Sequence, residues 1–304
     1  MPDKNFFKRW TIKICRYILG QKFLPVMAGP LKGYLWSTSY NYDYILGKYE
    51  ELQTSRLLSW LQPNSVFYDV GAHVGFHALA ANRIIQTGKI YAFEPMPAIR
   101  AVFEKHIILN RKFITNNNIS LSAMAISDEE KEVEFSNDAT HGAGNTYISE
   151  SYVFNGTANK IEVQCQSIDG LIKQGYAKPD IIKIDVEGAE YDVLLGAKQT
   201  LQLHKPNILL ATHDCHLPGV QQKCVAFLTE LGYHVHSTAS IINIWKAWMI
   251  ILPFITVNYS FEQYTKNKTP YSNTHLAVWR LREICFTAMQ SYQYPTVFCL
   301  PGCC

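Results

Sequence analysis

Short apolar runs alternate with amphipathic helical stretches along the chain from about residue 50. Strands are expected at 65–70, 89–93, 119–125, 132–136, 161–166, 180–185, 207–212, 234–237 and 275–280. Helices are expected at 51–61, 76–85, 98–110, 168–174, 189–203 and 220–231. Because strands alternate with helices, the pattern predicts an α/β fold in which a mostly parallel sheet carries helices on both faces. The near-continuous apolar runs at 181–184 and 208–211 are typical of central strands that are buried on both sides.

Acidic or polar side chains follow five successive strands of this pattern. They are Asp69, then Glu94, then Ser127 and Asp128, then Asp185, Glu187 and Glu190, and finally His213, Asp214, Cys215 and His216. Ligands of an open α/β sheet bind beyond the carboxyl ends of its strands. We therefore expect a ligand site along the edge where these residues meet.

The turn after the first strand indicates which ligand to expect. Its sequence is Asp69-Val70-Gly71-Ala72-His73-Val74-Gly75. A dinucleotide-binding turn has the pattern G-x-G-x-x-G, which brings backbone N–H groups close to a pyrophosphate. Here one glycine is missing and an acid precedes the first, which would repel a diphosphate but can hydrogen-bond a cationic ammonium. Glu94, at the end of the next strand, can accept both hydroxyls of a ribose. S-adenosylmethionine combines an adenosine with a cationic amino-acid tail, so the turn favours this cofactor.

At this point the sequence resembles the FkbM-type methyltransferases, which are class I S-adenosylmethionine-dependent enzymes. The resemblance is carried, in order, by Tyr-Ile-Leu-Gly-Lys-Tyr-Glu at 44–50, by 66–75, by Phe93-Glu94-Pro95, by 125–128, by Ser167-Ile168-Asp169 and by 182–190. It covers roughly residues 33–236, and Ile-Asp-Val-Glu-Gly-Ala-Glu at 184–190 is its most specific part. It implies a Rossmann-like, seven-stranded sheet whose last strand is antiparallel, for which 275–280 is the candidate. It also implies O-methylation, often of sugar hydroxyls in polysaccharides, glycolipids or natural products.

The expected cofactor-binding residues come from the glycine turn, the strand ends and the resemblance taken together. They are Glu50, Asp69, Gly71, Ala72, His73, Gly75, Glu94, Ser127, Asp128 and Asp185. Glu50 belongs to this set only because of the resemblance. His73 departs from the family, which commonly has Asn there.

Asp185, His213 and Glu187 are the expected catalytic residues. A sugar hydroxyl is a poor nucleophile at neutral pH, so a base or a metal ion should assist the transfer. In a metal-free mechanism, Asp185 or His213 is the base and Glu187 or Glu190 orients the substrate. In the alternative, Asp185 and Asp214 hold Mg²⁺ through hard oxygen ligands, whereas His213 would suit a softer ion.

Charge is distributed unevenly along the chain. The net charge is +3, and residues 1–32 carry seven Lys or Arg against Asp3 alone, so the remainder is mildly acidic. An acidic body argues against a nucleic-acid partner. Residues 1–20 have aromatic and aliphatic residues at helical spacing between the basic ones, so they are expected either to lie on an anionic membrane surface or to dock on their own domain.

Three segments are expected: a basic arm at 1–32, a methyltransferase domain at 33–283 with an insertion or lid at 239–274, and a Cys-rich tail at 284–304. The scattered cysteines favour a reducing compartment, and hence a cytoplasmic protein that is peripheral to the membrane if the arm binds lipid. The expected substrate is a small molecule or glycan that presents a hydroxyl. Two other functions remain open: an NAD-dependent oxidoreductase on a doubly wound sheet, and a non-catalytic glycan-binding protein on a methyltransferase fold.

Overall fold

The computed structural model describes residues 23–114, 116–136, 160–213, 217–237 and 296–301. The arm at 1–20, the segment at 239–274 and the strand expected at 275–280 lie outside the described residues. Within the described ranges, no helix combines the length and the apolar character needed to cross a membrane.

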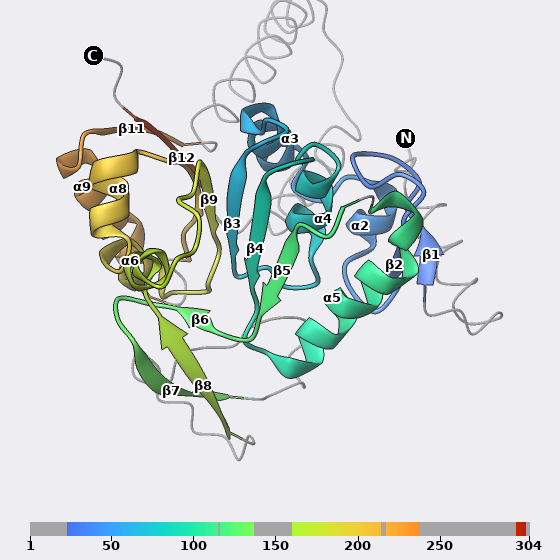
Figure 1. Cartoon of the computed structure of the whole chain (residues 1–304), viewed down its shortest axis with the longest axis horizontal. Helices are drawn as coiled ribbons and strands as arrows, with labels where there is room; N and C mark the ends of the chain where they lie inside the picture. Colours follow the sequence, from blue (N-terminus) through green and yellow to red (C-terminus); the bar gives the residue numbers. More distant parts are fainter. Residues whose placement is uncertain (1–22, 115, 137–159, 214–216, 238–295, 302–304) are drawn as a thin grey trace, which may run out of the picture.

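A central sheet organises the fold (Figure 1). Its strands, from one edge to the other, are β11 (Tyr233–Ser237), β12 (Thr296–Pro301), β10 (Asn207–Ala211), β9 (Ile181–Ile184), β3 (Val66–Val70), β4 (Lys89–Phe93) and β5 (Ile119–Ser122). Five neighbouring strands, β10, β9, β3, β4 and β5, form a continuous parallel sheet. The sheet has seven strands only when β12 and β11 are included. The expected α/β architecture with a parallel sheet is confirmed.

The antiparallel strand of the sheet comes from a different segment than the one expected. β12 pairs antiparallel with both β10 and β11, so residues 296–301 take the place that the sequence pattern gave to 275–280. The run Val-Phe-Cys-Leu at 297–300 is apolar but only four residues long, and Pro295 and Pro301 bound it. It lies beyond the domain boundary expected at residue 283, inside the segment that was assigned to the tail.

Helices cover both faces of the sheet. They are α2 (Tyr42–Leu46), α3 (Glu51–Trp60), α4 (Phe76–Asn82), α5 (Pro97–Leu109), α6 (Ile168–Lys173), α7 (Glu190–Leu195), α8 (Lys198–His204) and α9 (Val220–Glu230). Successive strand residues point to opposite faces, so Phe67 packs in one core and Tyr68 in another. The first core contains buried residues of α3 and α4, such as Leu57 and Leu79, and the second contains residues of α6 to α9.

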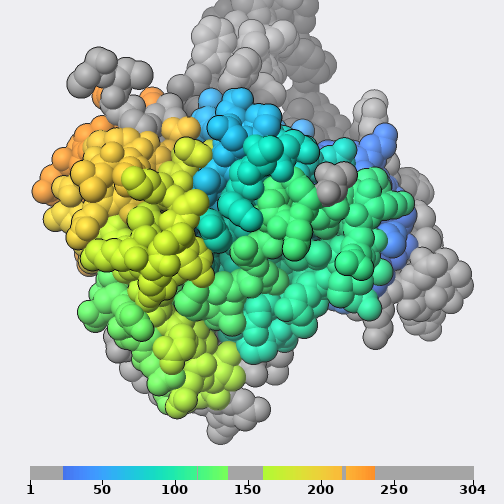
Figure 2. All heavy atoms as spheres, viewed as in Figure 1, coloured from blue at the N-terminus to red at the C-terminus, as the bar shows by residue number. Residues whose placement is uncertain are grey.

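Two predicted elements are each split in the structure. The helix expected at 189–203 is two helices, α7 and α8, and the split lies at Gly196, where an added Cβ would come within 2.0 Å of the Ser127 carbonyl oxygen. The strand expected at 119–125 ends at Ser122, and Ala125–Ile126 forms β6 of a second sheet. This sheet has the order β6-β8-β7, with β7 at Lys131–Ser136 and β8 at Lys160–Gln166. It forms the lower edge of the molecule in Figures 1 and 2.

A two-stranded sheet, β1 (Phe23–Pro25) and β2 (Leu35–Ser37), packs beside α5. The Asn110 side chain binds the backbone of Leu35 twice: Oδ1 accepts from its N–H at 2.7 Å and Nδ2 donates to its carbonyl at 3.0 Å. His106 Nε2 accepts from the Ser37 N–H at 3.0 Å. Val26 and Leu31 are buried, so the folded body begins inside the segment expected to be an arm.

Candidate active site

An open cavity lies at the carboxyl ends of β3, β4 and β9, with a volume of about 890 Å³ including its mouth. Its polar wall is formed by Gly71, His73, Glu94, Asp185 and Glu187. Its apolar wall is formed by Phe93, Met96, Ile99, Ile126 and Phe135. This combination of an apolar surface with a few convergent polar groups is typical of a site for a small molecule, and it occupies the edge that the strand pattern predicts.

Glu94 is held in one orientation on the cavity wall. Its Oε2 accepts the backbone N–H of His73 and its Oε1 accepts that of Met96, both at 2.9 Å. Burial raises the pKa of Glu94 to about 7, although these two hydrogen bonds oppose the rise. Each carboxylate oxygen can accept a further hydrogen bond, so the side chain presents two fixed acceptors to a ligand.

The glycine turn fits tightly against its neighbours. Gly71 has φ 76°, and a Cβ there would lie 1.9 Å from the carbonyl oxygen of Asp185. Gly75 has φ 88°, and a Cβ there would lie 2.1 Å from the Phe103 ring. Both positions therefore require glycine, which lets the turn approach the end of β9 and the side of α5.

Backbone strain is concentrated around the cavity. Among the described residues, four that are not glycine have positive φ: Glu50 (42°), His73 (50°), Glu187 (56°) and Lys205 (49°). His73 and Glu187 line the cavity, and Glu50 follows Tyr49, which also lines it. Such conformations persist only where the surrounding structure enforces them, and they are enriched at functional sites.

Lys183 is a central residue of the site that the sequence interpretation gave no role. It lies on β9 and is 5% exposed, and its Nζ donates to the Gly71 carbonyl at 2.8 Å. The same Nζ lies 3.5 Å from Asp69 Oδ1 and 3.3 Å from Asp185 Oδ2. Burial alone would lower the pKa of Lys183, but Asp185 and Asp69 outweigh it and raise the pKa above its ordinary value. A lysine inside an otherwise apolar strand was the available signal, because buried charges need partners.

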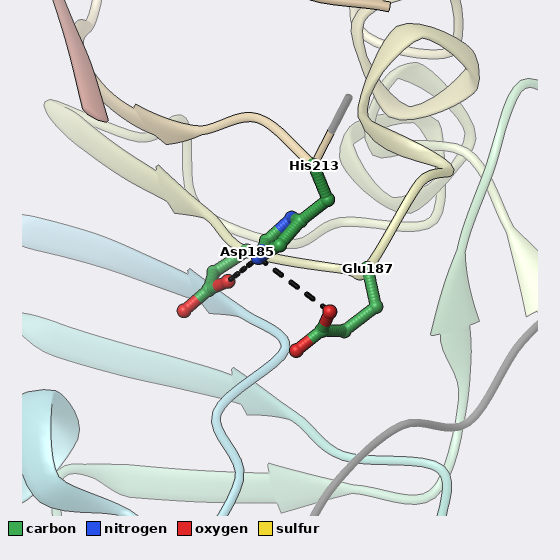
Figure 3. A group of neighbouring side chains, drawn as sticks. All are labelled: Asp185, Glu187 and His213. Carbon is green, nitrogen blue, oxygen red and sulfur yellow. Dashed lines mark ion pairs between the residues drawn. The ribbon is translucent and has the colours of Figure 1, made fainter. Parts of the chain in front are cut away.

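His213 is surrounded by three carboxylates. Its Nδ1 lies 2.6 Å from Glu190 Oε1, and its Nε2 lies 3.5 Å from both Asp185 Oδ1 and Glu187 Oε2. Figure 3 shows Asp185 and Glu187 pointing toward the imidazole from the loop after β9, and His213 reaching them from the end of β10. His213 and Glu190 are 3% and 0% exposed.

The charged residues around His213 shift one another's pKa values. Burial alone would lower the pKa of His213, but the hydrogen bond to Glu190 and the charges of Asp185 and Glu187 outweigh it and raise the pKa to about 9. Burial raises the pKa of Glu187 to about 7. Burial would also raise that of Asp185, but Lys183 and His213 hold it below its usual value.

A family model for the methyltransferase FkbM domain matches residues 69–235, which is more than half of the chain. The chain belongs to the FkbM methyltransferase family. It is 26% identical over 216 residues to methyltransferase sdnD of Sordaria araneosa, covering 62% of this chain and 81% of that relative. It is 26% identical over 205 residues to 31-O-demethyl-FK506 methyltransferase FkbM of Streptomyces tacrolimicus, covering 58% and 75%. It is 27% identical over 147 residues to hexuronic acid methyltransferase AglP of Haloferax volcanii, covering 48% of this chain and 55% of that relative. The predicted methyltransferase activity is confirmed.

This methyltransferase brings six of the thirteen predicted site residues together at the cavity. Gly71, His73, Glu94, Asp185 and Glu187 line one cavity. His213 contacts Asp185 and Glu187 from behind the cavity wall.

Other predicted residues surround the cavity without forming its wall. Glu50 is half-buried, with its Oε2 3.6 Å from His77 Nε2, and burial raises its pKa to about 7. Asp69 is fully buried and faces Lys183. Ala72 is buried within the turn, and Gly75 immediately precedes α4.

Ser127 and Asp128 follow β6 of the second sheet and are not among the residues that line the cavity. The Ser127 hydroxyl donates to Asp128 Oδ1 at 2.9 Å, and the same carboxylate lies 2.9 Å from Lys131 Nζ. Asp214, the second residue of the expected Mg²⁺ pair, lies outside the described residues.

Replacing Lys183 with Met is expected to lower the free energy of unfolding by about 3–5 kcal/mol, because removing one partner leaves buried carboxylates without a counter-charge. Urea denaturation followed by circular dichroism measures this change. Lys160→Met is the control, since Lys160 is 65% exposed and its contact with Glu134 is a surface ion pair. Loss of this surface ion pair should lower the free energy of unfolding by less than about 1 kcal/mol. Equal effects of the two substitutions would refute the role given to Lys183.

Proposed function

We propose that this methyltransferase takes its methyl group from S-adenosylmethionine and transfers it to a hydroxyl, with a sugar as the acceptor class. The observation that carries the proposal is the Glu94 carboxylate, which two backbone N–H groups fix on the cavity wall. A carboxylate held in this way matches the paired hydroxyls of a ribose.

The rest of the cavity fits the same cofactor. Asp185 and Glu187 give the polar wall an acidic character that suits a cation, and Met96, Ile126 and Phe135 offer an apolar surface for a flat base. His73 Nε2 is covered and makes no hydrogen bond within the part of the chain that the structure describes, so it has capacity for a ligand atom. S-adenosylmethionine, when bound, supplies an electrophilic methyl carbon on a sulfonium cation.

The name of one relative supports an oxygen acceptor, because it describes the substrate as a 31-O-demethyl compound. The name of another, a hexuronic acid methyltransferase, supports a sugar as the acceptor class. A hydroxyl must lose its proton as it accepts a methyl group. Asp185 and Glu187 line the cavity and contact His213, so this group is placed to orient the acceptor and take up that proton.

The cofactor assignment predicts that Glu94→Ala lowers the affinity for S-adenosylmethionine at least tenfold. The substitution removes hydrogen bonds to an ionised acceptor, each worth about 1.5–3 kcal/mol. Isothermal titration calorimetry on protein with an unchanged circular dichroism spectrum measures the effect. Glu104→Ala, at an exposed position of α5, is the matched control. Unaltered affinity in folded Glu94→Ala protein would exclude the ribose contact.

The affinity for S-adenosylmethionine should rise about tenfold between pH 6 and pH 8. Burial raises the pKa of Glu94 to about 7, so this carboxyl is mostly protonated at pH 6 in the free protein and mostly ionised at pH 8. Ribose hydroxyls donate to the ionised form, so affinity increases as the pH passes through 7. The groups that lower the pKa of Glu94 are the N–H groups of Met96 and His73 together with Lys183 and Arg100. Glu94 in turn acts on the Tyr40 hydroxyl.

The Glu94→Gln variant, measured by calorimetry over the same pH range, is the control for the pH dependence of the affinity for S-adenosylmethionine. Glu50 and Glu187 also have pKa values raised to about 7 by burial, so they can add a dependence of their own. The amide of Gln cannot ionise, and the part of the pH dependence that belongs to Glu94 should disappear. If affinity changed with pH by the same amount in the wild type and in Glu94→Gln, the prediction would be contradicted.

The transfer itself is tested by following S-adenosylhomocysteine formation with hexuronic acids, neutral sugars and polyketide alcohols as acceptors. Asp185→Asn is expected to lower the turnover about 10²–10⁴-fold, because the amide keeps the shape of the side chain and loses the charge that handles the acceptor proton. Affinity for S-adenosylmethionine should survive and fall far less than the turnover, because only one charge of the acidic wall is lost. An Asp185→Asn enzyme with near wild-type turnover would exclude this carboxylate from catalysis.

A further inference from the structure

Two carboxylate oxygens face His213 Nε2, and this arrangement needs a hydrogen or a cation between the atoms. Asp185 Oδ1 and Glu187 Oε2 lie at the same distance from this nitrogen, 3.5 Å, and all three atoms lie within 4.8 Å of one another. Ionised carboxylates only accept hydrogen bonds. A hydrogen on Nε2 or on a carboxyl, or a cation among the three atoms, can therefore hold them together.

The distances distinguish these two possibilities. A protonated imidazole makes charge-assisted hydrogen bonds to carboxylates of about 2.7–2.9 Å. His213 does so on its other side, where Nδ1 lies 2.6 Å from Glu190 Oε1. At Nε2 both separations are 3.5 Å, too long for such bonds. Two ligands of a tetrahedral ion with bonds of about 2.1 Å lie roughly 3.4 Å apart. The two separations between Nε2 and the carboxylate oxygens match this value.

Glu190 fixes which nitrogen faces the two carboxylates. Its Oε1 accepts the Gly188 N–H at 2.9 Å and lies against His213 Nδ1, and its side chain is fully buried. A buried carboxylate in this position keeps a hydrogen on Nδ1, so a metal ion that binds would displace the hydrogen of Nε2 and take the lone pair of that nitrogen. Metal-binding histidines are held by a carboxylate in the same way.

Asp185 divides its two oxygens between two partners. Oδ2 lies 3.3 Å from Lys183 Nζ, while Oδ1 faces His213. Lys183 therefore satisfies one oxygen and leaves the other directed at the group in Figure 3. Glu187 reaches the same point from a backbone with φ 56°, which only the surrounding structure can enforce.

We propose that Asp185 Oδ1, Glu187 Oε2 and His213 Nε2 form a binding site for a divalent transition-metal cation, with Glu190 orienting the histidine. This set differs from the expected Mg²⁺ pair by including an imidazole and Glu187. A mixed nitrogen and oxygen set suits ions such as Mn²⁺ or Zn²⁺ better than Mg²⁺.

The site is placed to act on the acceptor. Asp185 and Glu187 line the cavity, so a cation between them would take an acceptor hydroxyl as a further ligand and make its proton easier to remove. This role in the reaction depends on the function proposed above. The binding of the cation itself does not depend on it.

Binding is tested with Mn²⁺ alone, using the electron paramagnetic resonance signal of the free ion during titration of chelator-treated full-length protein. We expect one Mn²⁺ per chain. Glu187→Gln and His213→Gln should each lower the affinity at least about tenfold, and Glu190→Gln about 10–100-fold through the histidine. Glu187 is 25% exposed, so its variant should fold even if the buried histidine proves essential for stability.

Two controls separate this site from other effects. Asp128→Asn removes an acid that pairs with Lys131, away from the cavity lining, and should leave Mn²⁺ affinity unchanged. Glu94→Gln should lose affinity for S-adenosylmethionine and keep affinity for Mn²⁺. If Mn²⁺ binds but the cofactor does not, the metal site stands and the proposed function fails. A wild-type protein that binds neither Mn²⁺ nor Zn²⁺ at millimolar concentration, or a Glu187→Gln protein that binds as the wild type does, would overturn the metal site.

Discussion

The buried ammonium of Lys183 holds the centre of this methyltransferase together. Lys183 on β9 is the register neighbour of Asp69 on β3, and its Nζ also reaches Asp185 and the Gly71 carbonyl. One cation thus joins two central strands and the turn that follows the first of them. A charge in this place is tolerated because it has several partners, and those partners are the residues that shape the cavity.

That cation compensates only part of the negative charge around it. Six acidic residues gather near the carboxyl ends of the strands: Glu50, Asp69, Glu94, Asp185, Glu187 and Glu190. Lys183 and His213 are the cations that act on most of them, and burial raises the pKa of Glu50, Glu94 and Glu187 to about 7. A shortage of positive charge in a partly desolvated site is resolved by protonation or by binding a cation. A sulfonium and a metal ion would both relieve the same imbalance.

The sequence predicted which residues meet at this edge, and the structure adds the contacts between them. Polar residues interrupt apolar strands where parallel strands end together, so the positions of Glu94, Asp185 and His213 at one edge of the sheet follow from their places in the sequence. The role of Lys183 depends on partners from β3 and from the turn after it, which the sequence of its own strand does not reveal. Ser127 and Asp128 follow a strand end as well, but the chain leaves the central sheet after Ser122 and starts a second one at Ala125. Sequence alone does not reveal that departure, nor that residues 296–301 return to pair with β10.

The spacing of the acids after β9 follows from the backbone between them. Glu187 and Gly188 have φ values of 56° and 112°, two successive left-handed residues that reverse the chain before α7 begins. Without that reversal, Asp185 and Glu190 would continue away from each other. With this reversal, the Glu190 side chain lies against Nδ1 of His213. Asp185 and Glu187 contact Nε2 from the cavity side. The run Asp-Val-Glu-Gly-Ala-Glu is thus a compact means of placing three carboxylates around one imidazole. The strain at Glu187 is the local cost of directing two of them at the same atom.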